Sequence, residues 1–403
     1  MLIFVSDIHL TDDLRRASIQ TDALLSAVRS AMKRSVEKPT LILLGDIFEL
    51  LRSDLWIQDD LRPWLTPDDR LIETTRRITA RIIHANSEFF EGMRDLAQDG
   101  ASLVYLPGNH DRLLAEDVGA KARALLRTEL PLQGVGEALF QTPFPDAMHG
   151  VHAEHGHLFD EFNRQSKALG RFVPGDAVVV ELIAALPVEA ARALGSHSPY
   201  DEQYGERLAF LQEMDIIRPL TPEAIHTWLT AQVEALEPKH RIAVAPAIDR
   251  AMALCFRRFR QAMAAAKWGN AAVRWLALAL ESALWFRGFR AARALRYIPE
   301  LRSEELDAIR QRFMTYRSMD IDLVVAGHTH APACVPLMAP GAGAFTYLNT
   351  GTWCRVNAVL KDGKGKAMFR RLEEESMLCV YQREAPPDGQ DRRYEFIRHV
   401  RGY

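Results

Sequence analysis

The sequence predicts an α/β fold that a large helical insertion interrupts. Four short, continuously apolar runs have the composition of strands buried on both faces: LIFVS, LILLG, LVYLPG and LVVAG. Helical patterns at about 17–35 and about 70–99 lie between the first three runs, and alternating strands and helices are typical of a layered α/β core. From 160 to 318 the chain is instead rich in Ala, Leu, Arg and Glu, which favours helices.

These patterns divide the chain into three parts. We expect an α/β core at 1–159 and 320–383, a helical insertion or cap at 160–319, and a polar, loosely held tail at 384–403. Strand patterns return after 321 in IDLVVAG, AFTYLNTG, TWCRVNAVL and MLCVYQ, with Gly- and Pro-rich turns between them. Within the insertion, the one strand-like run is DAVVVELI at 176–183.

The composition is that of a soluble globular protein. Of the 403 residues, 48% are hydrophobic and 26% charged, and the net charge of −3 indicates neither nucleic acid nor membrane as a partner. The four cysteines lack C-x-x-C spacing and are interpreted as reduced thiols. The start, MLIFVSDIHL, lacks a basic region, so we expect no signal peptide; the apolar stretch 275–286 contains Glu281 and is too short to span a bilayer. We expect a cytoplasmic protein.

Polar side chains follow each of the four strand runs. Functional groups of such sheets collect beyond the carboxyl ends of the strands. Carboxylate, imidazole and amide groups without thiolates suit ions such as manganese, iron or zinc. Seven candidates around one shared carboxylate are enough for two ions, and a pair of ions can clamp an in-line displacement at phosphorus. The residues concerned are Asp7, His9, Asp46, Asn109, His110, His155, His328 and His330.

Five short motifs in this order resemble those of calcineurin-like metallophosphoesterases. They are D-x-H (Asp7, His9), G-D-x-x-E (Gly45, Asp46, Glu49), G-N-H-D (Gly108–Asp111), H-G (His155, Gly156) and G-H-x-H (Gly327, His328, His330). Each motif alone is weak, whereas five in order after buried-strand runs are specific. The resemblance covers about 1–160 and 320–360, and it implies a β-sandwich flanked by helices, an αββα arrangement.

The resemblance also implies a role for each motif residue. One ion would be bound by Asp7, His9, Asp46 and His330. Asp46 would bridge to a second ion, bound also by Asn109, His155 and His328. The ions would activate a water or hydroxide that attacks phosphorus. His110 would stabilise the phosphoryl group or protonate the leaving oxygen, and Asp111 would orient His110. Manganese is the preferred ion, with iron, zinc or magnesium as alternatives.

Ordinary structural roles remain open for several of these residues. Asp46 and Glu49 would by default be loop carboxylates that cap a helix, and His330 a surface residue. His155 has a rival in His157. His84, His197 and Cys354 are expected to be structural or exposed rather than catalytic, and Cys354 is expected to be a buried free thiol.

The segment 250–298 is strongly basic. It contains ten Lys or Arg against one acidic residue, Glu281, for a charge of +9, and tryptophans such as Trp268 and Trp275 lie among the cations. We first expect a core-facing aromatic stripe whose polar face pairs with acidic neighbours. The alternatives are a cap that meets an anionic or lipid-bearing substrate at a membrane surface, so that the protein would be peripheral there, and third, contact with nucleic acid.

The leading functional hypothesis is a two-metal hydrolase of a phosphodiester, phosphomonoester or pyrophosphate bond. SDIHL, GDIFE and GHTH look most like the branch that includes UDP-2,3-diacylglucosamine pyrophosphatases, which act on a nucleotide-linked lipid. GNHDR and HGHLFD depart from the GN(R/H)DF and HGD of that branch, and the insertion is longer. A DNA exonuclease-like member of the superfamily is the first alternative, and a non-catalytic binding scaffold on the same fold is the second.

Overall fold

The computed structural model describes most of the chain. The described residues are 1–13, 20–35, 38–132, 143–160, 162–196, 205–218, 222–265, 307–311, 320–339, 343–361, 367–382 and 393–402.

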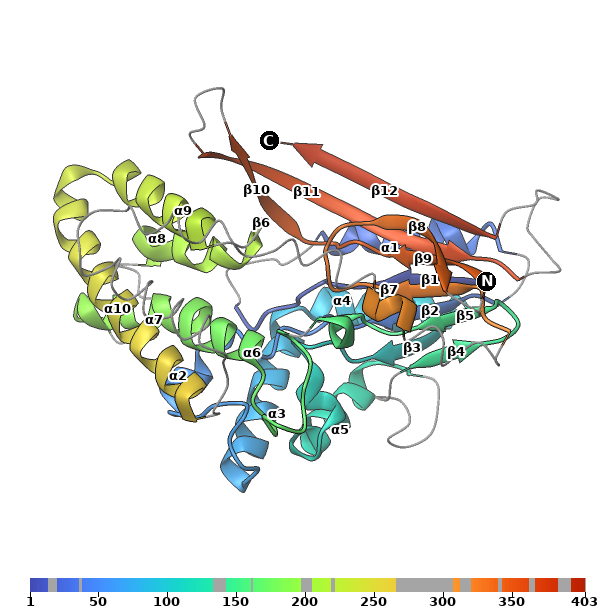
Figure 1. Ribbon diagram of the computed structural model, residues 1–403, viewed down its shortest axis with the longest axis horizontal. Coiled ribbons are helices and arrows are strands. Elements are labelled where there is room, and N and C mark those ends of the chain that lie inside the picture. The colour runs from blue at the N-terminus through green and yellow to red at the C-terminus, as the bar shows by residue number, and fades with distance from the viewer. Residues whose placement is uncertain are drawn as a thin grey trace.

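Two mixed β-sheets form the centre of the molecule (Figure 1). The first sheet has the order β3 (Ser102–Leu106), β2 (Thr40–Leu44), β1 (Leu2–Val5), β11 (Ala367–Val380), β10 (Arg355–Lys361) and β6 (Ile217–Arg218), with β12 (Tyr394–Gly402) also paired to β11. The second sheet has the order β4 (Phe144–Asp146), β5 (Val151–Ala153), β7 (Leu323–Ala326), β9 (Gly343–Asn349) and β8 (Ala333–Ala339). The four strands expected from the apolar runs are β1, β2, β3 and β7.

The four strands β1, β2, β3 and β7 are largely apolar because both of their faces are covered. In β1, Leu2 and Phe4 belong to an apolar cluster with Val325 and Leu348 of the second sheet. Ile3 and Val5 point the other way, into a cluster with the flanking helices. The outer face of the second sheet has a further apolar cluster that includes Phe159 and Ile309. The sheets therefore pack on each other and carry further layers outside, which confirms the predicted layered sandwich.

Helices flank the sheets. Those of the N-terminal half are α1 (Thr21–Met32), α2 (Leu55–Gln58), α3 (Asp69–Ala85), α4 (Ser87–Gln98) and α5 (Ala120–Glu129). Those that follow are α6 (Pro174–Val178), α7 (Ala185–Ala193), α8 (Gly205–Leu208), α9 (Pro222–Ala235) and α10 (Pro238–Ala265). In Figure 1, α7, α8, α9 and α10 gather at the left of the molecule, with α9 beside β6, while α6 lies nearer the centre.

The run DAVVVELI is helical, so its expected strand is wrong. Residues 176–183 belong to α6 and to a π-helical turn, Val179–Ala184, that continues into α7. The run lacks helical periodicity because its helix is buried on most sides. Its acidic residues are each paired: Asp176 accepts from Arg112 at 3.1 Å, and Glu181 pairs with Arg62. Through Arg112, α6 is attached to the G-N-H-D loop.

The C-terminal segment also departs from expectation. Residues Tyr394–Gly402 pair antiparallel with β11 along its length, from Tyr394 opposite Val380 to Gly402 opposite Leu372. The expected loosely held tail is therefore wrong for these residues, whose polar composition reflects an outer strand with exposed side chains. A strand of the insertion, β6, also joins the first sheet through β10. The division into core and insertion remains a proposal.

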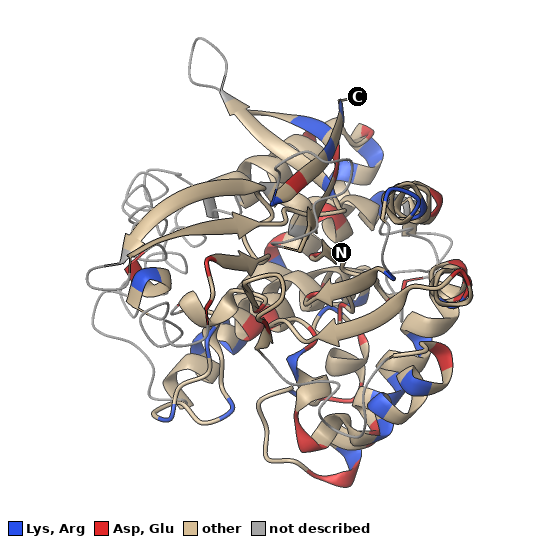
Figure 2. Ribbon diagram, turned by 90° about the vertical axis from the view of Figure 1, so that its right-hand side faces the viewer, with Lys and Arg blue, Asp and Glu red and all other residues tan. Residues whose placement is uncertain are grey.

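The described part of the basic segment is the end of α10. Its buried side chains include Cys255, Phe259 and Met263, and Arg258 pairs with Glu189 of α7 at 2.7 Å. Figure 2 shows basic and acidic residues intermixed on the helices. For residues 250–265, these contacts favour a helix whose apolar side faces the core and whose basic side pairs with acidic neighbours. The rest of that segment lies outside the described residues. Among the helices described, none combines the length and apolarity needed to cross a membrane.

Candidate metal centre

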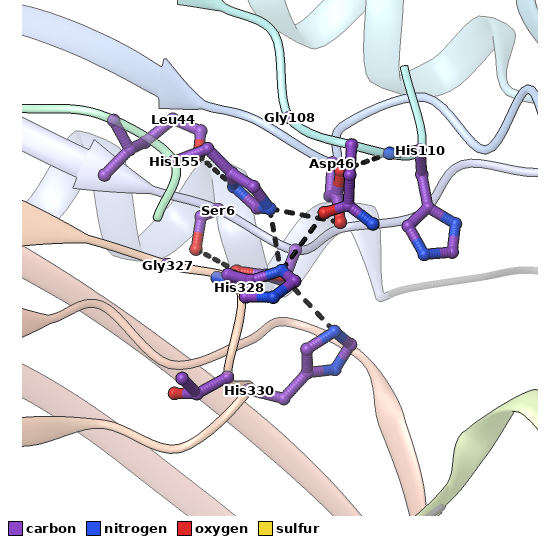
Figure 3. Close-up of polar contacts among 12 residues, drawn as sticks. Ser6, Leu44, Asp46, Gly108, His110, His155, Gly327, His328 and His330 are labelled. Carbon is purple, nitrogen blue, oxygen red and sulfur yellow. Dashed lines mark hydrogen bonds and ion pairs between the residues drawn. The ribbon is translucent and has the colours of Figure 1, made fainter. Parts of the chain in front are cut away.

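The structure brings the motif residues together at the strand ends. The side chains of Asp46, His155 and His328 point toward one another, with His110 and His330 beside them (Figure 3). Among the described residues, three sets have ligand atoms close enough to share an ion. These sets are Asp7–His9–His330, His9–Asp46–His110 and Asp46–His155–His328.

The first cluster is formed by Asp7, His9 and His330. Nε2 of His330 lies 3.3 Å from Oδ1 of Asp7 and 3.2 Å from Nε2 of His9. The other oxygen of Asp7, Oδ2, accepts from the backbone N–H of His328 at 2.9 Å. Nδ1 of His9 donates to Oε2 of Glu49 at 2.8 Å. Asp7 and His9 thus each have one atom fixed by the protein and present the other to the centre, which is how outer contacts orient metal ligands.

The second cluster contains Asp46, His155, His328 and Asn109. Nε2 of His155 lies 3.1 Å from Oδ2 of Asp46, and Nδ1 of His328 lies 3.1 Å from Oδ1 of Asn109. Nδ1 of His155 donates to the carbonyl of Leu44 at 2.9 Å, which leaves its Nε2 as the ligand atom.

Asp46 lies between the two clusters. Its Oδ2 is 3.1 Å from His155 and 3.9 Å from Nε2 of His9, which belongs to the first cluster. Its Oδ1 accepts from the backbone N–H of His110 at 2.8 Å. This is the position expected of a carboxylate that bridges two ions.

Backbone strain is concentrated at these residues. Seven described non-glycine residues have a left-handed φ, and five of them are predicted ligands. The five are Asp7 (52°), His9 (51°), Asp46 (51°), His328 (72°) and His330 (58°). Such conformations are uncommon outside glycine and persist where the surrounding structure enforces them, often at functional sites.

Two motif glycines are required by close packing. A Cβ at Gly108 would lie 2.2 Å from Oδ1 of Asp46 and 2.6 Å from its backbone nitrogen. A Cβ at Gly327 would lie 2.3 Å from Oγ of Ser6 and 2.5 Å from Oδ2 of Asp7. The glycines before Asn109 and His328 therefore let the loops approach the two carboxylates closely.

The charges and donor atoms of the site fit divalent cations. Oδ1 of Asp7 and Nε2 of His155 are buried and make no hydrogen bond with any described residue. Burial and the neighbouring Asp46 carboxylate raise the pKa of Asp7, as expected when two anions share a site without a cation. Burial lowers the pKa of His155, but Asp46 and Asp7 outweigh it and raise the pKa to about 9. Cations between these groups would satisfy the buried atoms and offset the repulsion.

Glu49, rather than Asp111, supports His110. Nδ1 of His110 lies 2.8 Å from Oε1 of Glu49. Asp111 instead accepts from the backbone N–H groups of Ile47 at 2.9 Å, Phe48 at 3.2 Å and Gly108. The expected orientation of His110 by Asp111 is therefore wrong. Asp111 fastens the G-N-H-D loop to the loop that carries Asp46.

The structure distinguishes His155 from His157 as the candidate metal ligand. His155 belongs to the second cluster, whereas the His157 ring centroid lies 5.6 Å from that of His155 and 6.5 Å from that of His328. Burial and the His155 imidazole lower the pKa of His157 well below 6.5. His84 is exposed and Cys354 is a buried free thiol, both as expected, while His197 lies outside the described residues.

Sequence reasoning missed Asp160. Its Oδ2 lies 3.2 Å from Nε2 of His328, whereas Nδ1 of the same ring faces Asn109 of the second cluster. The residue ends HGHLFD, a stretch that marked a departure from the metallophosphoesterase pattern. The local sequence carries no signal for this contact, because Asp160 and His328 are brought together by the fold.

Comparison with known proteins gives one distant relative and no family assignment. No family model matches the chain. The chain is similar to a UDP-2,3-diacylglucosamine hydrolase from Chromohalobacter salexigens, with 28% identity over 244 residues. The alignment spans 60% of this chain and 76% of that protein.

Proposed function

We propose that the protein is a phosphoester hydrolase that uses two divalent metal ions, with manganese preferred. The position of Asp46 between two clusters of ligand atoms carries this proposal. One ion would be bound by Asp7, His9, Asp46 and His330, and the other by Asp46, Asn109, His155 and His328. Bound ions would supply Lewis acidity toward phosphoryl oxygens and a nucleophilic water at neutral pH.

His110 is suited to donate a proton to the leaving oxygen. Burial lowers its pKa, but the Glu49 and Asp46 carboxylates outweigh burial and raise the pKa to about 10. In the ion-free protein the imidazole therefore carries a proton at neutral pH, and Glu49 fixes its orientation through Nδ1. Such a group can hydrogen-bond to a phosphoryl oxygen and then protonate the alkoxide or phosphate that leaves.

The similarity to this distant relative favours a substrate that contains a pyrophosphate bond. The substrate in that relative's name, UDP-2,3-diacylglucosamine, joins a nucleotide to an acylated sugar through a pyrophosphate. We propose a nucleotide-linked lipid of this kind as the first substrate class to test. In this proposal His110 of the G-N-H-D loop would donate a proton to the leaving phosphate of such a substrate.

Hydrolysis of generic and specific substrates tests the proposal. Metal-stripped protein is assayed with bis-p-nitrophenyl phosphate, p-nitrophenyl phosphate and UDP-2,3-diacylglucosamine, with and without Mn²⁺. We expect Mn²⁺-dependent hydrolysis that Asp46→Asn reduces by about a thousandfold or more, since the amide has no negative charge and only one oxygen to replace the two of the shared carboxylate. Asp99→Asn, an exposed change at the end of α4, is the matched control. Activity that is independent of metal, or equal in Asp46→Asn, would refute the proposal.

A further inference from the structure

Asp160 lies where the chain leaves the second sheet for the helical segment. It follows β5 and the short helical turn His157–Phe159. Its carboxylate faces His328 at 3.2 Å, and its side chain is 19% exposed. His328 comes from the loop after β7, so the contact joins two parts of the chain 168 residues apart.

The two nitrogens of His328 have different surroundings. Nε2 faces the Asp160 carboxylate, and Nδ1 faces Oδ1 of Asn109 at 3.1 Å. A carboxylate only accepts hydrogen bonds, so Nε2 must carry the proton and Nδ1 of the neutral ring is left as a lone pair. That lone pair and the Asn109 carbonyl oxygen are both acceptors, and two acceptors that face each other suit a shared cation.

The orientation of the Asp160 carboxylate is fixed by its own turn. Oδ1 accepts from the backbone N–H of Phe162 at 2.8 Å, and Oδ2 accepts from Nδ2 of Asn163 at 2.6 Å. The Asp160 carbonyl accepts from the backbone N–H of Asn163 and Arg164. The carboxylate is thus held toward His328 before any ligand arrives, which is what preorganisation of a metal ligand requires.

We propose that Asp160 is a positioning residue that selects the Nε2–H tautomer of His328 and so sets the ion affinity of the second cluster. The inference rests on the proposed function in one respect, the identity of the second cluster as an ion site. The tautomer itself is a property of the protein without ions. An acidic residue at the start of the helical segment would then control one of two ions and leave the other unaffected.

Asp160→Asn separates this role from simple packing. The amide oxygen can still accept from Phe162, and the Asn163 amide can turn its oxygen toward the new amide nitrogen. That nitrogen then donates toward Nε2 of His328. The ring is then driven to the Nδ1–H tautomer, whose proton blocks the ligand position. By titration calorimetry of metal-stripped full-length protein with Mn²⁺, we expect one ion to bind as in the wild type and the other to bind about 10- to 100-fold more weakly, the usual effect of losing such a partner.

Asn163→Ala is the matched control. It removes a hydrogen bond to the same Asp160 oxygen and leaves the carboxylate in place, so both ions should bind within about threefold of the wild-type affinity. Asp160→Ala is a second variant, which removes the carboxylate without supplying a hydrogen-bond donor. Its loss of Mn²⁺ affinity should be smaller than that of Asp160→Asn. Circular dichroism establishes that each variant is folded.

Nitrogen-15 NMR of metal-free protein labelled at histidine reads the tautomer directly, with His328→Gln to assign the signal. The proposal predicts Nε2–H in the wild type and Nδ1–H in Asp160→Asn. It is overturned if wild-type His328 carries its proton on Nδ1, if Asp160→Asn binds both ions as the wild type does, or if Asn163→Ala loses as much affinity as Asp160→Asn. Should the wild type bind no ion, the proposed function fails, and the NMR result still decides the role of Asp160.

Discussion

Glu49 holds His9 and His110 with the two oxygens of one carboxylate. Nδ1 of His110 lies 2.8 Å from Oε1, and Nδ1 of His9 lies 2.8 Å from Oε2. Burial raises the pKa of Glu49, but the two imidazoles outweigh it and lower the pKa below its usual range. A single buried anion therefore orients a proposed metal ligand and the proposed proton donor.

Glu49→Gln should lower kcat by about a hundredfold, the range typical of a positioned acid, and change its pH profile. Without the Glu49 charge, the pKa of His110 falls from about 10, so the imidazole loses its proton at a lower pH. The alkaline limb of kcat/KM should accordingly move to lower pH. If the alkaline limb of kcat/KM stays at the wild-type pH in a folded Glu49→Gln variant that binds both ions, Glu49 does not support His110.

Asp111→Asn should affect stability more than the pH profile. Oδ2 of Asp111 accepts from the backbone N–H groups of Ile47 and Phe48, and Oδ1 accepts from that of Gly108. Replacing either oxygen by an amide donor therefore leaves one or two of these N–H groups without an acceptor. A buried donor left without its partner costs about 1–3 kcal/mol. Urea unfolding measures the change. If the variant instead shifts the alkaline limb as Glu49→Gln does, the assignment of the two carboxylates is reversed.

Gly108→Ala should disrupt ion binding because the new Cβ would lie 2.2 Å from Oδ1 of Asp46. The contact with the Asp46 backbone nitrogen, at 2.6 Å, prevents relief by side-chain rotation alone. Gly100→Ala is the matched control: Gly100 has a φ of 103° and nothing within 4 Å of its Cβ position. The control should lose about 1 kcal/mol from backbone strain and keep its ions. Equal ion affinities in Gly108→Ala and Gly100→Ala would contradict the expected clash between a Cβ at position 108 and Asp46.

Asp12, which is not one of the proposed ion ligands, should make stability depend on pH. Burial raises its pKa to about 6, above the value of 3.8 for a free side chain, although Arg81 and Ser53 partly offset burial. The native state therefore favours the protonated form, whose stabilising effect is complete below about pH 4 and is lost as the pH rises through 6. Relative to Asp12→Asn, the wild type should lose on the order of 2–3 kcal/mol between pH 4 and 7. Denaturation of both proteins across this range checks the difference, and parallel curves would contradict it.

The strand-end motifs could be predicted because each has a local cause. Apolar runs buried on both faces identify β1, β2, β3 and β7, and parallel strands such as β1, β2 and β3 bring their carboxyl ends to one edge. The sequence therefore placed Asp7, Asp46 and Asn109 near one another. The pairing of outer strands such as β12 and β8 could not be predicted from the sequence, since their residues show no clear alternation of apolar and polar side chains.

The contacts around the motifs depend on distant parts of the chain. Asp111 follows His110 directly, yet the loop turns its carboxylate toward the backbone of Ile47 and leaves His110 to Glu49. Asp160 reaches His328 only because β5 and β7 are neighbours in the second sheet. Likewise, the run at 176–183 is apolar because its helix is enclosed, which a single sequence does not distinguish from a buried strand.

The number of ions bound per chain tests the central claim, that Asp46 is shared by two ion sites. Metal-stripped protein is reloaded with Mn²⁺, dialysed, and its metal content is measured by plasma mass spectrometry for the wild type, Asp46→Asn and Asp99→Asn. We expect two ions per chain in the wild type and in Asp99→Asn, and fewer than one in Asp46→Asn. One ion or none in the wild type, or two in Asp46→Asn, would contradict it.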